Sequence, residues 1–306
     1  MFARLALGLV ALIAILALVA CVQIIRNSGQ KDLTAPVADA IRLATYNVHY
    51  IITFRETGPW SVGDWERRKG PLDLAFKAID ADLIGFQEME SFGGRSASPT
   101  NLTLDWLLLQ NPGYGAAAVG NPADFPSTQP ILYRKDRLID RSQGWFFFSD
   151  TPDVIYSRTF NGSFPAFASW AAFEDKQNGA AFRVVNIHTD FRSRSNRLKS
   201  MDLVAARIAP WIAADETLFV MGDFNARHGA QTLKIVGETG IRFPKVQGAT
   251  YHLNRGINLF GAIDHIGIVG RAQPNGEPIV LRQKFDGEWP TDHYPVILDV
   301  ALDAEG

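Results

Sequence analysis

Acidic, amide and imidazole side chains stand at the ends of short apolar runs along this sequence. Such polar residues converge when their strands are neighbours at one edge of a sheet, which is where ligand sites form. In chain order, the residues placed in this way are Asn47, Glu88, Asn186, His188, Asp190, Asp223, Asn225, His252, Asp264, Asp292 and His293.

The oxygen donors of this set suit a hard cation. Glu88 and Asp292 supply carboxylates and Asn47 supplies a neutral oxygen, which are the ligands that Mg²⁺ takes. Mn²⁺ is the alternative ion. A bound cation of this kind neutralises the charge that grows on phosphoryl oxygens during ester cleavage. Because Cys21 is the only cysteine, a structural zinc site is not expected.

The remaining residue types suit hydrolysis by water. Asp223 and Asn225 can accept hydrogen bonds from a water molecule and hold it in line for attack. His293 can contact the phosphate or move a proton, and Asp264 can fix its tautomer. His188 is a further donor for phosphoryl oxygens.

Substrate contacts are predicted from residues that flank the His188 block. They are Asn186 and Asp190 in "VVNIHTD", Arg192 and Arg194 in "FRSRSNRLKS", and His252. The two arginines fit the solvated start of a helix equally well. For His252, a structural role in the core is the simpler interpretation.

Strands and a few helices must position these side chains. Helices are predicted at 65–80, 101–110 and 194–214, the last from apolar residues at steps of three and four. A pattern of many strands with few helices predicts two sheets packed together and flanked by helices. The predicted strands lie in "IRLATYNV", "ADLIGFQE", "PILYRKD", "FASWAAFE", "FRVVNIHTD", "ETLFVMGDFN", "GAIDHIGIVG" and "HYPVILDVAL".

Residues 5–25 form an apolar run that is broken only by Gln23. At 1.5 Å per residue, this run spans about 30 Å, the thickness of one hydrocarbon core. The run predicts a signal anchor or a lipoprotein signal cleaved before Cys21 in "LVAC". The anchor is preferred because the hydrophobicity continues past the cysteine. Either interpretation places the rest of the chain at a membrane surface, outside the cytoplasm.

The charge balance does not indicate a general nucleic-acid binder. The formal net charge is -2. Residues 1–30 contain two basic side chains and no acid, so the remainder carries 28 basic against 32 acidic groups, or -4. An anionic substrate must therefore be held by a local basic patch or by a metal ion.

Eight blocks, taken in order, resemble the endonuclease/exonuclease/phosphatase superfamily, and a bacterial branch in particular. They are "TYNV", "GFQE", "YRKDRL", "NIHTD", "GDFN", "TYH", "IDHI" and "TDHYPV". The resemblance covers residues 41–302, which we expect to be one catalytic domain after a polar linker at 26–40. It implies an α/β fold, the four-layer α/β/β/α sandwich called DNase I-like, and Mg²⁺-dependent cleavage of a phosphate ester.

The resemblance also assigns roles. Asn47 and Glu88 match metal-site positions, and His188 matches a phosphate-contacting histidine. Asp223 and Asn225 match the pair that positions the nucleophile. Asp264 and His293 match the catalytic Asp–His pair, and Asp292 matches the acid beside it. The last block has Thr291 where serine is usual.

Three functions are considered. The leading prediction is a metal-dependent phosphoesterase that acts on nucleic acid as a nuclease. The alternative is a phosphatase or phospholipase that acts on lipid headgroups, which the apolar N-terminus favours. An inactive binding module is the least supported, because Glu88, Asp223 and His293 are all present. A monomer is expected.

Overall fold

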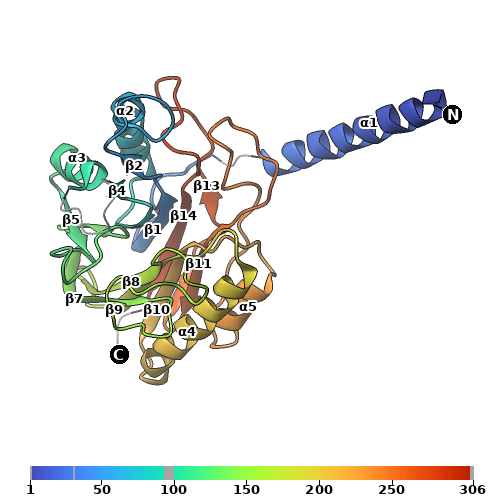
Figure 1. The fold of residues 1–306 in the computed structure, drawn as a ribbon. Helices are drawn as coiled ribbons and strands as arrows, with labels where there is room; N and C mark the ends of the chain where they lie inside the picture. Colours follow the sequence, from blue (N-terminus) through green and yellow to red (C-terminus); the bar gives the residue numbers. More distant parts are fainter. Residues whose placement is uncertain (1, 30–31, 93–99, 304–306) are drawn as a thin grey trace.

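Two β-sheets pack face to face in the computed structural model, which describes residues 2–29, 32–92 and 100–303. One sheet has the strand order β12–β14–β1–β3–β6–β5, with β13 also paired to β14, and the other has the order β11–β10–β9–β8–β7. Helices cover the outer faces (Figure 1). This arrangement confirms the predicted four-layer α/β/β/α sandwich.

The strands of the described chain are β1 (Ala40–Asn47), β2 (Ile51–Ile52), β3 (Leu83–Gln87), β4 (Ser91–Phe92), β5 (Tyr114–Ala117), β6 (Ile131–Arg134), β7 (Leu138–Phe147), β8 (Phe167–Asp175), β9 (Ala181–His188), β10 (Thr217–Asp223), β11 (Asp264–Val269), β12 (Ala272–Pro274), β13 (Ile279–Val280) and β14 (Val296–Leu302). The helices are α1 (Phe2–Asn27), α2 (Val62–Ile79), α3 (Leu102–Gln110), α4 (Arg194–Ala213) and α5 (Gln231–Gly237).

The three predicted helices form as α2, α3 and α4, and each begins at a side-chain cap. Ser61, Asn101 and Ser193 each accept a hydrogen bond from the backbone N–H three residues later. Such caps satisfy N–H groups that have no partner inside the helix. The short helix α5 and the two-residue strands were not predicted, because they are too short to show a sustained apolar pattern.

Strand direction brings one end of each sheet to the same edge of the sandwich. β1 runs parallel to β3, and β9 runs parallel to β10. β14 is antiparallel to β1, and β11 is antiparallel to β10. The carboxyl ends of the two parallel pairs therefore lie beside the amino ends of β11 and β14.

The core is divided by the alternation of side chains along each strand. On β1, Ile41 and Leu43 face the other sheet, whereas Ala44 and Tyr46 pack under the outer helices. On β10, Phe219 faces inward and Val220 packs against the outer layer. Because successive strand residues point to opposite faces, every second residue of β1 and β10 reaches the space between the sheets.

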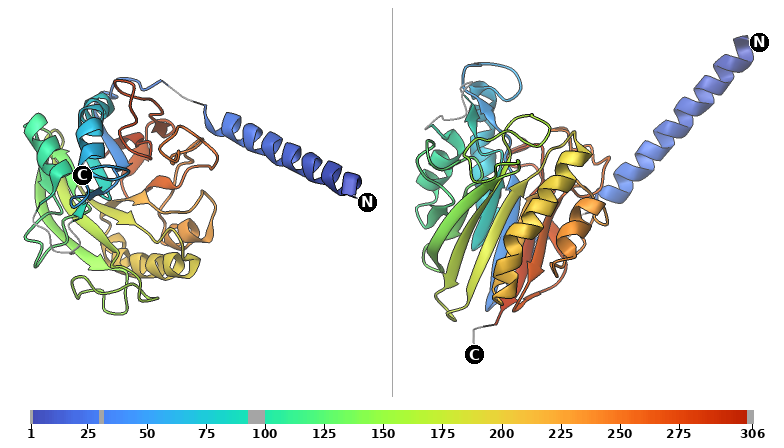
Figure 2. Two further views of the ribbon diagram at one scale, coloured as in Figure 1. Left: turned by 45° about the horizontal axis from the view of Figure 1, so that its top comes forward. Right: turned by 60° about the horizontal axis from the view of Figure 1, so that its bottom comes forward.

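Helix α1 extends away from the sandwich, and the chain's C-terminal segment lies at the far end of the sheets (Figure 2). The stretch Ala6–Asn27 is long and apolar enough to cross a membrane or to serve as a signal, and none of its most apolar window is buried. Of the predicted linker at 26–40, residues 26 and 27 belong to α1, and residues 30 and 31 lie outside the described residues.

A buried ion pair joins β1 to β14. The guanidinium of Arg42 donates through Nε to Asp299 Oδ1 at 2.7 Å and through Nη2 to Asp299 Oδ2 at 2.9 Å. Arg42 also donates to the carbonyl oxygens of Thr34 and Ile79. A bidentate pair of this kind fixes the relative position of the two side chains, and removing one partner leaves the other charge buried and unpaired.

We therefore expect Arg42→Met to lower the free energy of unfolding by about 3–5 kcal/mol, because Asp299 keeps its burial but loses its partner. The change is measured by denaturant unfolding of the full chain in detergent. Arg141→Met is the matched control, since Arg141 pairs with Glu174 at an exposed position and its loss should cost under about 1 kcal/mol. Equal losses in the two variants would contradict the prediction.

Candidate active site

The shared edge of the two sheets collects the polar side chains that the sequence singled out. Asn47 ends β1, His188 ends β9, Asp223 ends β10 and Asp264 begins β11. On β1 and on β10, the site residue stands on the same face as apolar core residues deeper in the strand. The site therefore sits at the point where the inner core layer meets solvent.

Asn47, Glu88, Asp223 and His188 surround one point. The Asn47 amide donates through Nδ2 to Glu88 Oε1 at 3.1 Å and to Asp223 Oδ2 at 3.3 Å. His188 Nε2 lies 3.7 Å from both of these oxygens. The four side chains come from both sheets, so the site bridges the two halves of the sandwich.

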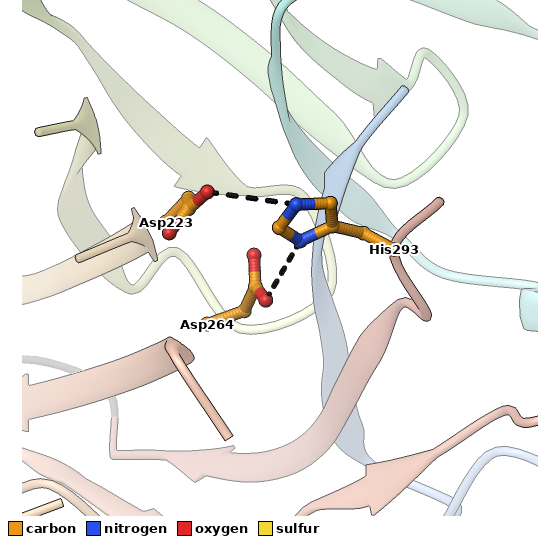
Figure 3. Close-up of side chains that lie close together, drawn as sticks. All are labelled: Asp223, Asp264 and His293. Carbon is orange, nitrogen blue, oxygen red and sulfur yellow. Dashed lines mark hydrogen bonds and ion pairs between the residues drawn. The ribbon is translucent and has the colours of Figure 1, made fainter. Parts of the chain in front are cut away.

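A second contact chain joins the same point to the last strand. His293 Nδ1 lies 3.0 Å from Asp264 Oδ2, and His293 Nε2 lies 3.8 Å from Asp223 Oδ2 (Figure 3). Figure 3 shows both carboxylates on one side of the imidazole, each facing a different ring nitrogen. The backbone N–H of Asp264 donates to Thr250 Oγ1 at 3.2 Å, which helps to hold the acid in place. The contact with Asp264 thus orients the ring so that Nε2 points to Asp223.

The electrostatics of this chain are set by crowded acids. Burial lowers the pKa of His293, but Asp264, Asp223 and Asp292 outweigh it and raise the pKa well above the usual range. Burial and the Asp264 carboxylate raise the pKa of Asp223 to about 6. At neutral pH, His293 is therefore a hydrogen-bond donor, and Asp223 is a base whose pKa is near the working pH.

Two of the site residues have a strained backbone conformation that orients their side chains. Glu88 has φ 53° and Asn225 has φ 45°, both in the left-handed region. This conformation costs a non-glycine residue about 1 kcal/mol or more. It turns Glu88 into the site just after β3 ends. The N–H of Asn225 donates to Asp223 Oδ1 at 2.8 Å, and its Nδ2 donates to the Thr189 carbonyl at 2.9 Å, so Asn225 positions Asp223.

Gly222 allows the close strand contact that carries Asp223. It has φ 142°, and a Cβ there would lie 1.9 Å from the carbonyl oxygen of Ile187. Any side chain would push β10 away from β9, so the sequence "MGDFN" needs glycine at this position.

Asp292 lies beside a residue that the sequence pattern missed. His49 Nε2 is 3.9 Å from Asp292 Oδ2, and the backbone N–H of His49 donates to Asn47 Oδ1 at 3.2 Å. The hydroxyl of Thr291 donates to the Asn47 carbonyl at 3.0 Å. A sequence signal existed, because His49 follows Asn47 by two residues, but its left-handed φ of 63° could not be anticipated.

Two of the predicted substrate contacts are engaged in structural hydrogen bonds. Asn186 is fully buried and accepts a hydrogen bond from Gln87 Nε2 at 2.6 Å, which links the two sheets below the site. Asp190 accepts from the backbone N–H groups of Arg192 and Ser193, and so shapes the start of α4.

His252 lies under the site rather than in it. Its ring is fully buried and stacks on Tyr294 at 4.1 Å, and its backbone N–H donates to the Asp292 carbonyl at 2.9 Å. The remaining two predicted contacts, Arg192 and Arg194, are exposed side chains at the start of α4. They are available to a ligand, unlike His252.

The donors fit a hard divalent cation at Glu88. Burial together with the carboxylates of Asp292 and Glu88 raises the pKa of Tyr251, so both acids act on the same part of the cleft. The two acids offer carboxylate oxygens, as Mg²⁺ and Mn²⁺ prefer. Asn47 turns Nδ2 towards Glu88 and would offer Oδ1 to the ion once its amide is turned over. Asp223, Asp264 and His293 also lie within 4.8 Å of one another. We assign no ion there, because His293 Nδ1 and Asp264 Oδ2 are already hydrogen-bonded to each other.

No protein-family model matches the chain. In sequence, the chain is 28% identical over 169 residues to protein L388 of Acanthamoeba polyphaga mimivirus, which is uncharacterized. The match covers 54% of this chain and 60% of that protein, so it spans less than two thirds of the relative.

Solved structures match over most of the chain. An endonuclease/exonuclease/phosphatase family protein from Bacteroides thetaiotaomicron superposes with a TM-score of 0.72 at 23% identity, covering 88% of this chain and all of that one. A mannosyl-6-phosphatase of the same organism gives 0.70 at 23% identity, covering 85% and 99%. The zebrafish protein TDP2, solved with a single-strand DNA product, gives 0.61 at 15% identity, covering 85% and 98%.

The chain has the endonuclease/exonuclease/phosphatase fold. This confirms the fold that the eight sequence blocks implied. In the endonuclease/exonuclease/phosphatase fold of this chain, the collected acids and imidazoles stand at the open edge between the two sheets, and their roles are proposed below.

Glu88→Gln should weaken binding of Mn²⁺ by about tenfold or more, because an amide replaces the most accessible carboxylate of the oxygen set. The free Mn²⁺ in a titration of the full chain, followed by electron paramagnetic resonance, measures the affinity without any need for turnover. Glu174→Gln removes an acid from the exposed face of β8 and is the control. Unchanged affinity in Glu88→Gln would move the ion elsewhere.

Proposed function

We propose that this protein is a metal-dependent hydrolase of phosphate esters. The observation that carries the proposal is the convergence of Glu88, Asn47 and His188 with the Asp264–His293–Asp223 chain within hydrogen-bond or near-contact distances. The fold that the chain shares with phosphoesterases supports it. An inactive binding module would not need a strained, acid-rich cluster that is this complete.

The residues act on water and on the phosphate. Asp223 accepts a proton from a water molecule whose oxygen forms the new bond to phosphorus, and Asn225 keeps Asp223 oriented. The ester P–O bond breaks on the opposite side, and the departing alcohol takes a proton from solvent. His293 donates from Nε2 to a phosphoryl oxygen, while Asp264 holds Nδ1. His188 offers a second donor.

Bound at Glu88, Asn47 and Asp292, Mg²⁺ or Mn²⁺ supplies the positive charge that stabilises the developing negative charge on phosphoryl oxygens. The protein's own part is to hold the ligand oxygens of these three residues in place before the substrate arrives. Thr291 and the His49 N–H do this by holding the two oxygens of Asn47, one on its backbone and one on its side chain.

Nucleic acid stays the predicted substrate class from sequence, and one local feature supports it. Phe191 is 69% exposed, and the Arg192 guanidinium lies 5.0 Å from the centre of its ring. An exposed aromatic ring beside an arginine can stack a base and hold a backbone phosphate. TDP2 was solved with a single-strand DNA product, which is in keeping with this assignment.

The Asp264–His293 pair should behave as one unit. His293→Ala is expected to lower kcat on bis(p-nitrophenyl) phosphate by about 10²–10⁴-fold, as for a positioned proton donor. Asp264→Asn should cost less, because a misoriented imidazole still works part of the time. The double variant should be little worse than His293→Ala alone, because residues that act together are non-additive.

Rates are measured at saturating Mg²⁺, and circular dichroism checks the fold of each variant. His228→Ala, which removes an exposed imidazole outside the cluster, is the matched control and should keep its activity. Additive losses, or near-native turnover in His293→Ala, would remove the pair from the mechanism.

A further inference from the structure

The end of α1 is attached directly to a loop beside the active site. The N–H of Ala249 donates to the Asn27 carbonyl at 3.0 Å, and Asn27 Nδ2 donates to the Leu259 carbonyl at 3.3 Å. Asn258 Nδ2 donates to Ser28 Oγ at 2.9 Å. The apolar stretch of α1 ends at Asn27, so no spacer separates it from the sandwich.

Two further features lock this attachment. Gly248 has φ 75°, and a Cβ there would lie 2.6 Å from the Asn27 carbonyl oxygen. Arg282 is nearly buried and donates both to the Ala249 carbonyl at 2.8 Å and to the Gly29 carbonyl. Loop residues 247–260 and the base of α1 are therefore joined by a network of hydrogen bonds.

This loop presents apolar side chains to solvent on the side from which α1 leaves. Leu253, Ile257 and Phe260 are each 36% exposed or more. The Arg227 guanidinium lies 5.7 Å from the ring of Phe260. Apolar side chains mixed with arginine suit the boundary between lipid headgroups and acyl chains, where each part of the surface finds its preferred surroundings.

The same loop forms one wall of the cleft beside the site. A cleft of about 260 Å³ is lined by Leu253, Asn254 and Arg255 on one side and by Trp60, His49 and Asp292 on the other. The loop is held to the site by the hydrogen bond from the His252 N–H to the Asp292 carbonyl. Whatever surface this loop touches therefore lies next to the acids.

We propose that the loop 252–260 docks on the bilayer into which α1 inserts and holds the active-site cleft at the headgroup layer. In Figure 2, α1 points away from the sandwich. The site residues gather where β1 and β10 end, beside this loop. Resting on the proposed hydrolase function, this orientation points to a membrane-lipid phosphate ester, the alternative substrate class from sequence. Nucleic acid, which the Phe191–Arg192 pair would suit, is the competing outcome of the test below.

Lipid contact is tested first, by a measurement that does not depend on turnover. The full chain with Cys21→Ala is placed in vesicles of phosphatidylcholine and phosphatidylglycerol, and an environment-sensitive fluorophore is attached after Ile257→Cys. Brominated lipid should quench this label strongly. Leu109→Cys on α3, an exposed apolar position on another surface, is the matched control and should be quenched little. Equal quenching at the two positions would overturn the docking.

The substrate is tested with the pair Ile257→Ser and Phe260→Ser. Hydrolysis of phosphatidylglycerol or phosphatidic acid in vesicles should fall about tenfold, because two apolar contacts with the bilayer are lost. Hydrolysis of soluble bis(p-nitrophenyl) phosphate should be unchanged. If the parent chain cleaves single-stranded DNA and no vesicle lipid, the lipid assignment is overturned. If it cleaves none of these esters, the proposed hydrolase fails, whereas the quenching result still decides the docking.

Discussion

The alternation of side chains along β1, β3, β9 and β10 is the constraint on which the rest of this structure depends. Asn47, His188 and Asp223 face the space between the sheets because they fall on the same strand parity as core residues such as Leu43, Val184 and Met221. A shift of one residue in register would turn each of them to the opposite face. The Gln87–Asn186 hydrogen bond stabilises this register, because it joins the two sheets at the level where the core becomes polar.

Acid crowding explains the chemistry that the edge can support. Asp223, Asp264, Asp292 and Glu88 converge on a space that holds only two imidazoles of the catalytic set, so a phosphate approaching it meets net negative charge. Such a site needs added positive charge before an anionic ester can bind. His293 supplies part of this charge, because the acids around it hold its pKa high. A divalent cation at Glu88 would supply the rest.

Much of this site was visible in the sequence, because polar residues at strand ends are a local signal. Strand periodicity predicted the two sheets, and the same parity brought Asn47, Asp223 and Asp264 to one edge. Glu88 reaches this edge only through its left-handed backbone just after β3 ends. What could not be predicted depends on contacts distant in the chain. His49 owes its place to a left-handed backbone and to Asp292, and Asn186 joins a partner in the other sheet.

Local contacts also explain why two residues that the sequence pattern assigned to the site lie outside it. Asp190 follows His188 within the "NIHTD" block, yet it accepts N–H groups of the residues that follow and starts α4. An aspartate two and three residues before unpaired N–H groups is a turn signal in its own right. His252 was equally ambiguous, and its stacking on Tyr294 and the hydrogen bond from the Gly256 N–H to its Nδ1 hold it in the core.

The pairing of β1 with β14 has a consequence for the newborn chain. Asn47 is made early and His293 is made among the last residues, yet they belong to one site. Ribosomes add about 5–20 residues per second, so roughly 12–50 seconds pass between the two. During that time α1 has already emerged, while the hydrolytic centre lacks its imidazole and Asp292. The nascent chain thus stays inert until its final strand closes the sheet.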